Sequence, residues 1–225
     1  MDIDLTPIDG RNIDIAYFLD FAAEELKKHI SLVKNKDYKK IAFASSNKNN
    51  FKKFFEEIIP LMFFLQKEKG IYSKIKYMSG DQKGDAILDD SVTIEITKAQ
   101  NENKYWGKQD ILTHGYAFSP KNIQNTVSTN SPTKTQPYVH TNEEHIRDVA
   151  LYIHQAIEEK LKKNYPYGSI LIILFESDTL MLECDGDYYR LEKEVMNFRK
   201  GIFSRIYLLE NFLNQDLQPK WQFIL

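Results

Sequence analysis

Acidic and basic side chains gather in one short segment, residues 83–98, that has the composition of a β-hairpin. Asp85 and Glu95 lie on either side of an Asp-Asp-Ser turn, with Lys83 before the first acid and Lys98 after the second. Carboxylate oxygens are ligands that hard divalent cations such as Mg²⁺ prefer, and a bound cation lowers the pKa of a coordinated water. These residue types predict a site for a hard divalent cation if the hairpin brings the two acids together.

The alternation of side chains along the hairpin decides whether the acids meet. A three-residue turn at 89–91 pairs apolar residues with one another on one face, namely Leu88 with Val92 and Ala86 with Ile94. In this register Asp85 faces Glu95 on the other face, with Cβ atoms about 5 Å apart. A two-residue turn would mix polar with apolar partners, so we predict the three-residue turn. The two acids then either share a divalent cation or lie solvated on an exposed sheet face.

The elements around the hairpin predict an α/β fold. Apolar residues recur at helical spacing in three segments, at about 14–34, 49–69 and from 141 onward. Strands are expected at 73–78, 85–88, 92–98, 170–175 and 205–209, and a further helix at about 191–200. Pro60 should kink the second helix, and Thr141 with Glu144 forms a capping box at the start of the third. This order predicts a central mixed β-sheet flanked by helices on both faces.

The length of 225 residues suits one sizeable core or two small domains, and we predict a single α/β domain spanning 1–225. We expect an N-terminal helical extension over about 1–48. A long mobile loop is expected over about 116–142, where Ser, Thr, Asn and Pro dominate without periodicity. Tyr105, Trp106 and Tyr116 near this loop are candidates for stacking on nucleic-acid bases.

Charge and cysteine content restrict the class of protein. The net charge of −2 argues against a protein that coats nucleic acid non-specifically but leaves room for a local basic groove. The single cysteine, Cys184, excludes an intramolecular disulfide and favours a reducing compartment. The N-terminus lacks the basic and then apolar pattern of a secretory signal, and no apolar run approaches the roughly 20 residues of a membrane helix. We therefore expect a cytoplasmic protein with no membrane partner.

The hairpin also carries a family resemblance. Gly84-Asp85, nine residues, and then Glu95-Ile-Thr97-Lys98, in an α-β-β-β-α-β order, resembles the PD-(D/E)XK nuclease superfamily over roughly residues 50–176. The resemblance implies a restriction-endonuclease-like core and hydrolysis of phosphodiester bonds in DNA. It also implies Mg²⁺, or Mn²⁺ in its place, as the cofactor, held by Asp85 and Glu95.

The sequence departs from this family pattern at two positions. Gly84 stands where the family often has proline. The family also places a lysine two residues after the second acid, where it positions or activates the attacking water; here Thr97 takes that position and Lys98 follows one residue later. In a regular strand Lys98 points to the wrong face. Either a β-bulge at Thr97 swings Lys98 across, or Lys83 serves from the neighbouring strand.

Two functions follow as expectations. The first is a Mg²⁺-dependent nuclease-like enzyme acting on DNA, with Asp85 and Glu95 as metal ligands and with Lys98 and Lys83 as further catalytic candidates. Glu56 and Glu57 on the preceding helix are candidates for an additional ligand. The alternative is a non-catalytic protein-interaction module with a decayed nuclease-like fold, which the displaced lysine and the nearly neutral charge favour. A homodimer or a protein partner stays open for both.

Overall fold

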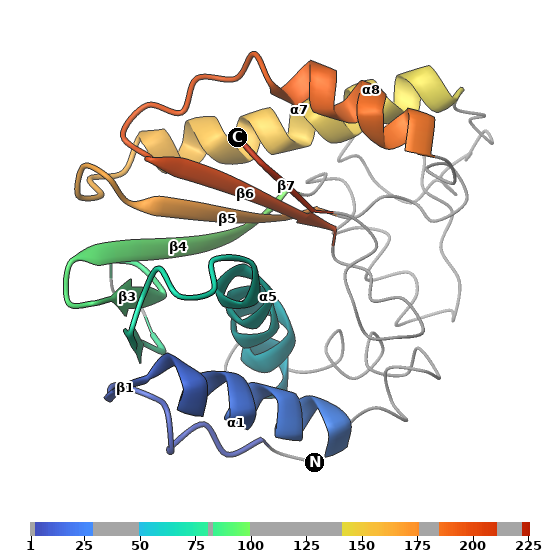
Figure 1. The fold of residues 1–225 in the computed structure, drawn as a ribbon. Helices are drawn as coiled ribbons and strands as arrows, with labels where there is room; N and C mark the ends of the chain where they lie inside the picture. The colour runs from blue at the N-terminus through green and yellow to red at the C-terminus, as the bar shows by residue number, and fades with distance from the viewer. Residues whose placement is uncertain (1–2, 29–49, 81–82, 100–140, 176–184, 211–221) are drawn as a thin grey trace, which may run out of the picture.

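A computed structural model of the chain describes residues 3–28, 50–80, 83–99, 141–175, 185–210 and 222–225. In these residues an open, seven-stranded mixed sheet is flanked by helices on both faces (Figure 1). The predicted α/β fold class is confirmed. The loop expected over about 116–142 lies outside the described residues except for its last two, and so do the three aromatic candidates for stacking.

The strands lie in the sheet in the order in which they occur in the sequence. They are β1 (Asn12–Asp14), β2 (Lys74–Tyr77), β3 (Ala86–Leu88), β4 (Val92–Ala99), β5 (Ile170–Phe175), β6 (Arg205–Glu210) and β7 (Gln222–Ile224). Strands β4, β5 and β6 are parallel to one another, and every other neighbouring pair is antiparallel. A parallel pair needs a long crossover connection, and the chain between each of these parallel strands includes a helix.

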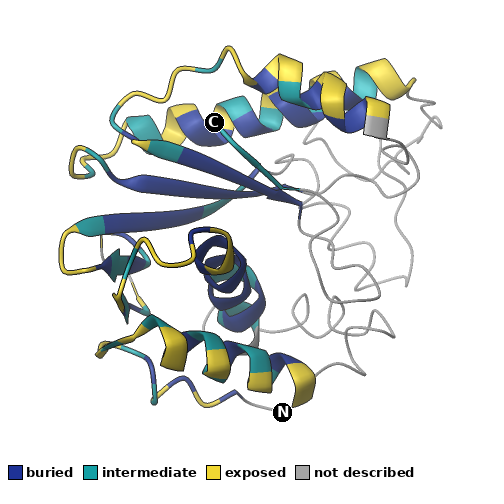
Figure 2. Cartoon of the chain, in the orientation of Figure 1, coloured by how far each residue is buried: buried dark blue, intermediate teal, exposed yellow. Residues whose placement is uncertain are grey.

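The helices cover the two faces of the sheet and enclose one apolar core on each. One face carries α1 (Ile15–Lys28) and the consecutive segments α4 (Asn50–Lys53), η1 (Phe54–Ile58) and α5 (Ile59–Lys67). The other face carries α7 (Asn142–Leu161) and α8 (Asp185–Val195). All six residues of β5 are buried between these layers (Figure 2), which confirms the buried strand expected from its apolar run. In the described part of the chain no helix is long and apolar enough to cross a bilayer.

A π-helical turn, η1, directly precedes α5, in whose first turn Pro60 lies, where the sequence predicted a kink. The amide of Ile59 donates to the carbonyl of Phe54, five residues back. Pro60, at the start of α5, has no amide hydrogen and cannot donate to the carbonyl of Glu56. The π-turn lies where this hydrogen bond of a regular α-helix would be missing. Single π-turns of this kind are frequent at functional sites, and this one carries both Glu56 and Glu57.

The ends of the described chain differ from the sequence prediction. Residues 3–28, expected within a helical extension, contribute β1 to the sheet and α1 to the core. Helix α8 begins at Asp185, six residues before the predicted start. Strands β1 and β7 were not predicted, because three residues are too few to show an alternating pattern.

Candidate functional site

The β3–β4 hairpin has the predicted register. Leu88 pairs with Val92 and Ala86 with Ile94, and the amide of Ser91 donates to the carbonyl of Leu88 at 3.0 Å. Asp89 and Asp90 adopt the left-handed conformation that this turn requires, with φ of 45° and 57°. Aspartate tolerates that conformation better than most residues. The three-residue turn is thus confirmed.

Asp85 immediately precedes Ala86, the first residue of β3, and is fixed there by three hydrogen bonds. Its amide donates to the carbonyl of Ile94 at 2.8 Å, and its carbonyl accepts from the amide of Met78 at 2.9 Å. Its side-chain Oδ2 accepts from the amide of Ile96 at 2.6 Å. The carboxylate therefore takes the place of a backbone acceptor for the amide of Ile96, the residue that follows Glu95 in β4.

Gly84 gives the backbone the turn that leads into Asp85. Its φ is +90°, and a Cβ at this position would lie 2.5 Å from Cγ2 of Thr93 and 3.0 Å from the carbonyl oxygen of Ile94. Proline, whose ring fixes φ near −65°, cannot adopt this conformation. The departure from the family's proline therefore has a backbone cause, and only glycine fits the observed approach of the two strands.

We expect Gly84→Ala to lower the free energy of unfolding by about 3 kcal/mol, because it adds left-handed strain to a steric overlap with β4. Urea denaturation measures the change. Gly10→Ala is the matched control, since φ there is +69° but a Cβ would meet no atom within 4 Å. That variant should lose only about 1 kcal/mol. Equal losses in the two variants would contradict the close packing of Gly84.

Glu95 lies in the middle of β4 and points to the face that α7 covers. Its neighbours Ile94 and Ile96 belong to the core on the opposite face, which leaves the glutamate buried under α7. Nζ of Lys160, near the end of α7, lies 2.5 Å from Oε1 of Glu95. The side chains of this pair are only 14% and 10% exposed. Tyr165, in the loop after α7, also hydrogen-bonds Glu95, and burial together with this bond raises the pKa of the tyrosine.

The surroundings of Asp85 raise the pKa of its carboxyl group to about 7. Burial contributes most, and the negative charge of Glu95 adds to it; the Ile96 amide and Lys160 act in the opposite direction. Neighbouring carboxylates repel each other unless a proton or a cation lies between them. At neutral pH the group is therefore balanced between its two protonation states, and a bound cation would favour the ionised one. Carboxyl groups tuned in this way are concentrated at functional sites.

A third acid, Glu57, acts on Asp85 from the π-turn. Oε2 of Glu57 accepts a hydrogen bond from the hydroxyl of Tyr77 at 2.5 Å. Burial raises the pKa of Glu57, and the charge of Glu57 in turn contributes to the raised pKa of Asp85. Glu56, the neighbouring residue, instead accepts a hydrogen bond from Nζ of Lys98 at 2.8 Å. Of the two candidates for an additional acid, Glu57 is thus the one whose charge acts on Asp85.

In the described residues neither of the two lysines named from the sequence forms an ion pair with Asp85 or Glu95. Strand β4 pairs with β5 residue by residue through Lys98 and Ala99, so the bulge considered at Thr97 is not formed. Lys98 therefore lies on the same face as Ile96, opposite Glu95. Lys83 is exposed at the bend that precedes Gly84.

Lys160 is the cation that the sequence analysis missed. It lies 65 residues after Glu95 in the sequence. The sequence signal for it was a run of three lysines, Lys160, Lys162 and Lys163, which is equally typical of a solvated helix end. Only the packing of α7 on the sheet selects the one lysine of this run that reaches Glu95.

The donor set fits a magnesium ion. Mg²⁺ is usually held by one or two carboxylates and completes its shell with water and substrate phosphate oxygens. Asp85 and Glu95 supply two carboxylates. In the described ranges no cluster of three or more His, Cys, Asp or Glu side chains is arranged to hold a metal ion. A cation at this position would therefore depend on the pair and on oxygens from water and substrate.

No protein-family model, curated protein or solved structure matches this chain. The function is therefore inferred from the geometry and chemistry of the site.

Proposed function

We propose that the protein is a Mg²⁺-dependent, nuclease-like enzyme that hydrolyses phosphodiester bonds in DNA, with Asp85, Glu95 and Lys160 as its catalytic groups. The supporting observation is the pair of neighbouring carboxylates with one buried lysine against it. Placing two acids together away from water costs stability, as the raised pKa of Asp85 indicates. Such a cost is typical of sites where the acids serve a bound cation.

The three side chains have distinct roles in this proposal. Asp85 and Glu95 would hold Mg²⁺, or Mn²⁺ in its place, which when bound polarises the scissile phosphate and lowers the pKa of a coordinated water. Lys160 keeps Glu95 oriented and places a positive charge where negative charge develops on the phosphate oxygens. The reaction consumes one water: its oxygen bonds to phosphorus, the bond to the leaving oxygen breaks, and its protons pass to the leaving oxygen and to solvent.

A cleavage assay with the full chain tests the proposal. Supercoiled plasmid and labelled oligonucleotides are incubated with Mg²⁺ or Mn²⁺, and with EDTA instead of metal. We expect metal-dependent cleavage that Asp85→Asn slows by about 100-fold or more. Asp90→Asn is the matched control, because Asp90 is an exposed aspartate in the turn of the same hairpin. Absence of cleavage by the wild-type protein with both metals would overturn the proposal.

A second pair of variants decides which lysine serves the site. Lys160→Met should slow cleavage by about 100-fold, since it removes the charge next to Glu95. Lys98→Met should leave the rate within a few-fold of wild type, because Lys98 contacts Glu56 on the other face of the sheet. The rates are compared under single-turnover conditions at equal protein concentration. The opposite ranking would assign the role to Lys98 and contradict the role proposed for Lys160.

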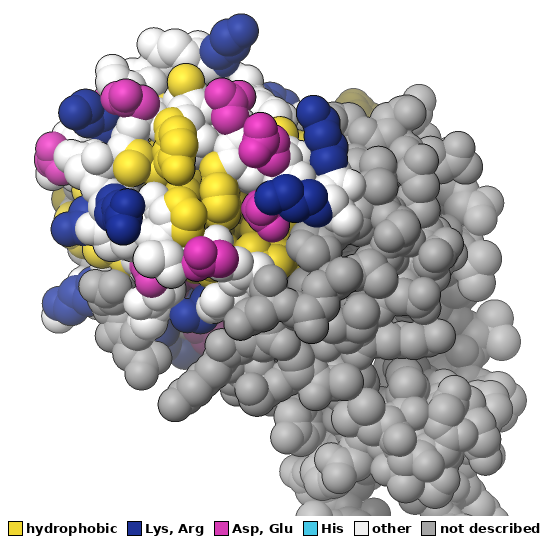
Figure 3. All heavy atoms as spheres, turned by 90° about the horizontal axis from the view of Figure 1, so that it is seen from below, with side chains coloured by type: hydrophobic (Ala, Val, Ile, Leu, Met, Phe, Trp, Pro, Cys, Tyr) yellow, Lys and Arg dark blue, Asp and Glu magenta, His cyan; other side chains and the backbone are white. Residues whose placement is uncertain are grey.

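The alternative function, a non-catalytic protein-interaction module, is favoured by one surface feature. Hydrophobic side chains gather on the face of the molecule that carries α1 (Figure 3). In α1, Tyr17 is 50% exposed, and Leu19 and Phe21 are only partly buried. Exposed apolar patches commonly mark sites of protein association. If the wild-type protein neither cleaves DNA nor binds Mg²⁺, this interpretation replaces the enzymatic one.

A further inference from the structure

Two loops lie side by side at the edge of the sheet where α7 and α8 end and β5 and β6 begin. They are residues 162–169 and 196–204, which we call the basic edge. The amide of Gly168 donates to the carbonyl of Ile202 at 2.9 Å, and the hydroxyl of Ser204 donates to the carbonyl of Gly168 at 2.8 Å. The rings of Tyr165 and Phe203 are in contact, with centroids 5.8 Å apart. The two loops therefore form one continuous surface.

The basic edge has a charge distribution unlike that of the whole chain. It contains Lys162, Lys163, Arg199 and Lys200, all exposed, and neither loop contains an aspartate or a glutamate. The chain as a whole carries a net charge of −2. Basic residues near helix ends offset the helix dipole, but that effect is confined to the last turn. Arg199 and Lys200 follow the last residue of α8 by four and five positions, so the dipole does not explain them.

Tyr167 is the most exposed large hydrophobic side chain of the described residues, at 92%. It lies between Pro166 and Gly168 in a loop that is internally braced, because the carbonyl of Pro166 accepts from both the amide and the hydroxyl of Ser169. The ring is therefore held in solvent by a stiff segment. Aromatic rings presented in this way beside cations are the elements that bind unpaired bases and phosphates of single-stranded nucleic acid.

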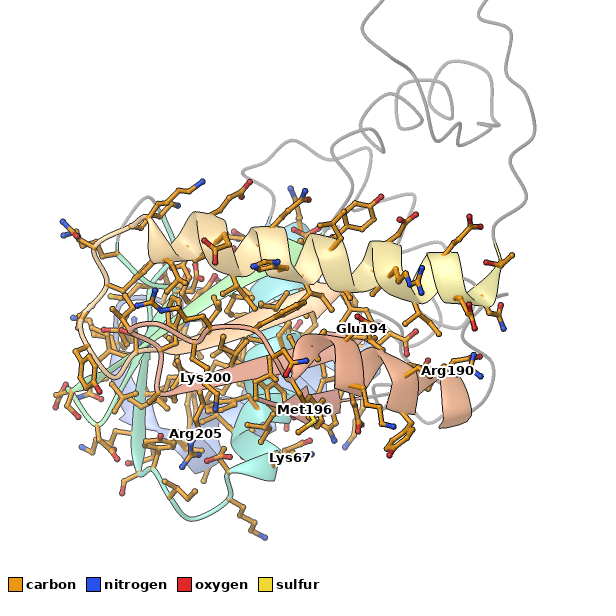
Figure 4. The ribbon with its side chains drawn as sticks, turned by 90° about the horizontal axis from the view of Figure 1, so that it is seen from above. Lys67, Arg190, Glu194, Met196, Lys200 and Arg205 are labelled. Carbon is orange, nitrogen blue, oxygen red and sulfur yellow. The ribbon has the colours of Figure 1, made fainter. Side chains whose placement is uncertain are left out.

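The basic edge is joined directly to the candidate site. Tyr165, two residues before Tyr167, hydrogen-bonds Glu95 from the same loop. Lys160, which pairs with Glu95, lies in the last turn of the helix from which this loop departs. Figure 4 shows Lys200 and Arg205 at the side of the molecule where α8 passes into β6. The loop that carries Tyr167 and the helix end from which it departs thus both contact Glu95, which places the basic edge next to the acid pair.

We propose that the basic edge binds a single-stranded segment of DNA, with Tyr167 stacked on an unpaired base and with Lys162, Lys163, Arg199 and Lys200 on the phosphates. The inference rests on the proposed function, and it specifies that the DNA bound near the candidate site is single-stranded. A duplex offers no free base face to Tyr167, whereas a single strand offers one at every nucleotide. An acidic peptide would match the charges but would leave the tyrosine without a planar partner.

Binding is measured with the full chain and without divalent metal, so that it does not depend on cleavage. The fluorescence anisotropy of a labelled thymidine oligonucleotide of about 20 nucleotides is compared with that of a duplex of equal length. We expect the single strand to bind more tightly, and Tyr167→Ala to weaken it by about tenfold. Replacing Lys162, Lys163, Arg199 and Lys200 by glutamine should reduce the steepness of log K against log salt by about 0.7 for each phosphate that is no longer neutralised.

Tyr17→Ala is the matched control, because Tyr17 is an exposed tyrosine as well but lies on α1 at the other face of the sheet. It should leave the affinity unchanged. Equal affinity for duplex and single strand, an equal effect of Tyr17→Ala and Tyr167→Ala, or equally effective competition by poly-glutamate would each overturn the inference. Single-strand binding without cleavage in the presence of Mg²⁺ would instead retain the inference and refute the proposed hydrolysis.

Discussion

The Asp85→Asn variant should be more stable than the wild-type protein at pH 8, by up to about 4 kcal/mol, although it is expected to cleave DNA far more slowly. The ordinary pKa of the carboxyl group is 3.8, and in the folded protein it is about 7. Asparagine mimics the protonated carboxyl group and can still accept the hydrogen bond from the amide of Ile96. The substitution therefore removes the repulsion from Glu95 and the cost of burying a charge.

The same pKa fixes the sign of the pH dependence. Between about pH 4 and 7 the folded protein retains a proton on Asp85 that the unfolded chain has already released. The contribution of Asp85 to the unfolding free energy is thus fully present below about pH 4 and is lost as the pH rises through 7. Asp85→Asn cannot titrate, so its stability should fall less steeply over this interval.

Urea denaturation at pH 5, 6, 7 and 8 in EDTA measures both effects. Mg²⁺ added at pH 8 in place of EDTA should stabilise the wild-type protein, because a cation between the acids replaces the missing proton, and should leave Asp85→Asn unchanged. The exposed Asp90→Asn serves as the control and should follow the wild-type pH profile. A variant Asp85→Asn that is less stable than wild type at pH 8 would show that the two carboxylates do not repel each other.

Lys160→Met should lower the free energy of unfolding by about 3 kcal/mol. The pair that it forms with Glu95 is almost entirely buried, with 14% and 10% of the two side chains exposed. Removing the lysine leaves Glu95 and Asp85 together with no cation paired to either, and an uncompensated buried charge costs more than an ion pair contributes. The loss should be smaller at pH 5 than at pH 8, since protonation relieves the repulsion.

A double-mutant cycle separates this buried charge from ordinary packing. Glu95→Leu combined with Lys160→Met should recover most of the stability that Lys160→Met alone loses, giving a coupling of about 2 kcal/mol. The double variant should also stay inactive, which distinguishes folding from function. Additive effects of the two substitutions would contradict a direct contact between the side chains.

The same strand offers a matched control pair on its other face. Lys98 and Glu56 form a lysine–glutamate contact of 2.8 Å, but about a quarter of each side chain is exposed. Solvent screens such a pair, so the coupling between Lys98→Met and Glu56→Leu should be below about 1 kcal/mol. The contrast between the two faces of β4 measures the effect of burial with the residue types held constant.

A gain of stability together with a loss of cleavage in Asp85→Asn would support the functional role proposed for the site. A structural ion pair would lose stability when either partner is neutralised. Neutralising Asp85 is expected to increase stability, because the charges of Glu95 and Glu57 act on it as well as that of Lys160. Active sites are often less stable than the fold allows, and substitutions in them commonly stabilise the fold while they remove activity.

Local sequence patterns determined much of the fold. The register of the β3–β4 hairpin followed from the alternation of Ala86, Leu88, Val92 and Ile94, because a shift of one residue would move every apolar side chain to the wrong face. The capping box of Thr141 and Glu144 located the start of α7, and the apolar run located β5 to the residue. Each of these signals lies within a few residues of the element that it specifies.

Only the tertiary structure decided which cation accompanies the acids. Lys98 was a close neighbour of Glu95 in sequence, but the regular pairing of β4 with β5 directs it away from Glu95, and Lys160 arrives from a helix 65 residues later. The packing of α7 on the sheet, and that of the π-turn against Tyr77, depends on contacts between distant segments. The sequence pattern of one hairpin predicts which of its side chains share a face. It does not predict which helix covers that face, because the packing of the helix depends on burial of apolar surface from the whole chain.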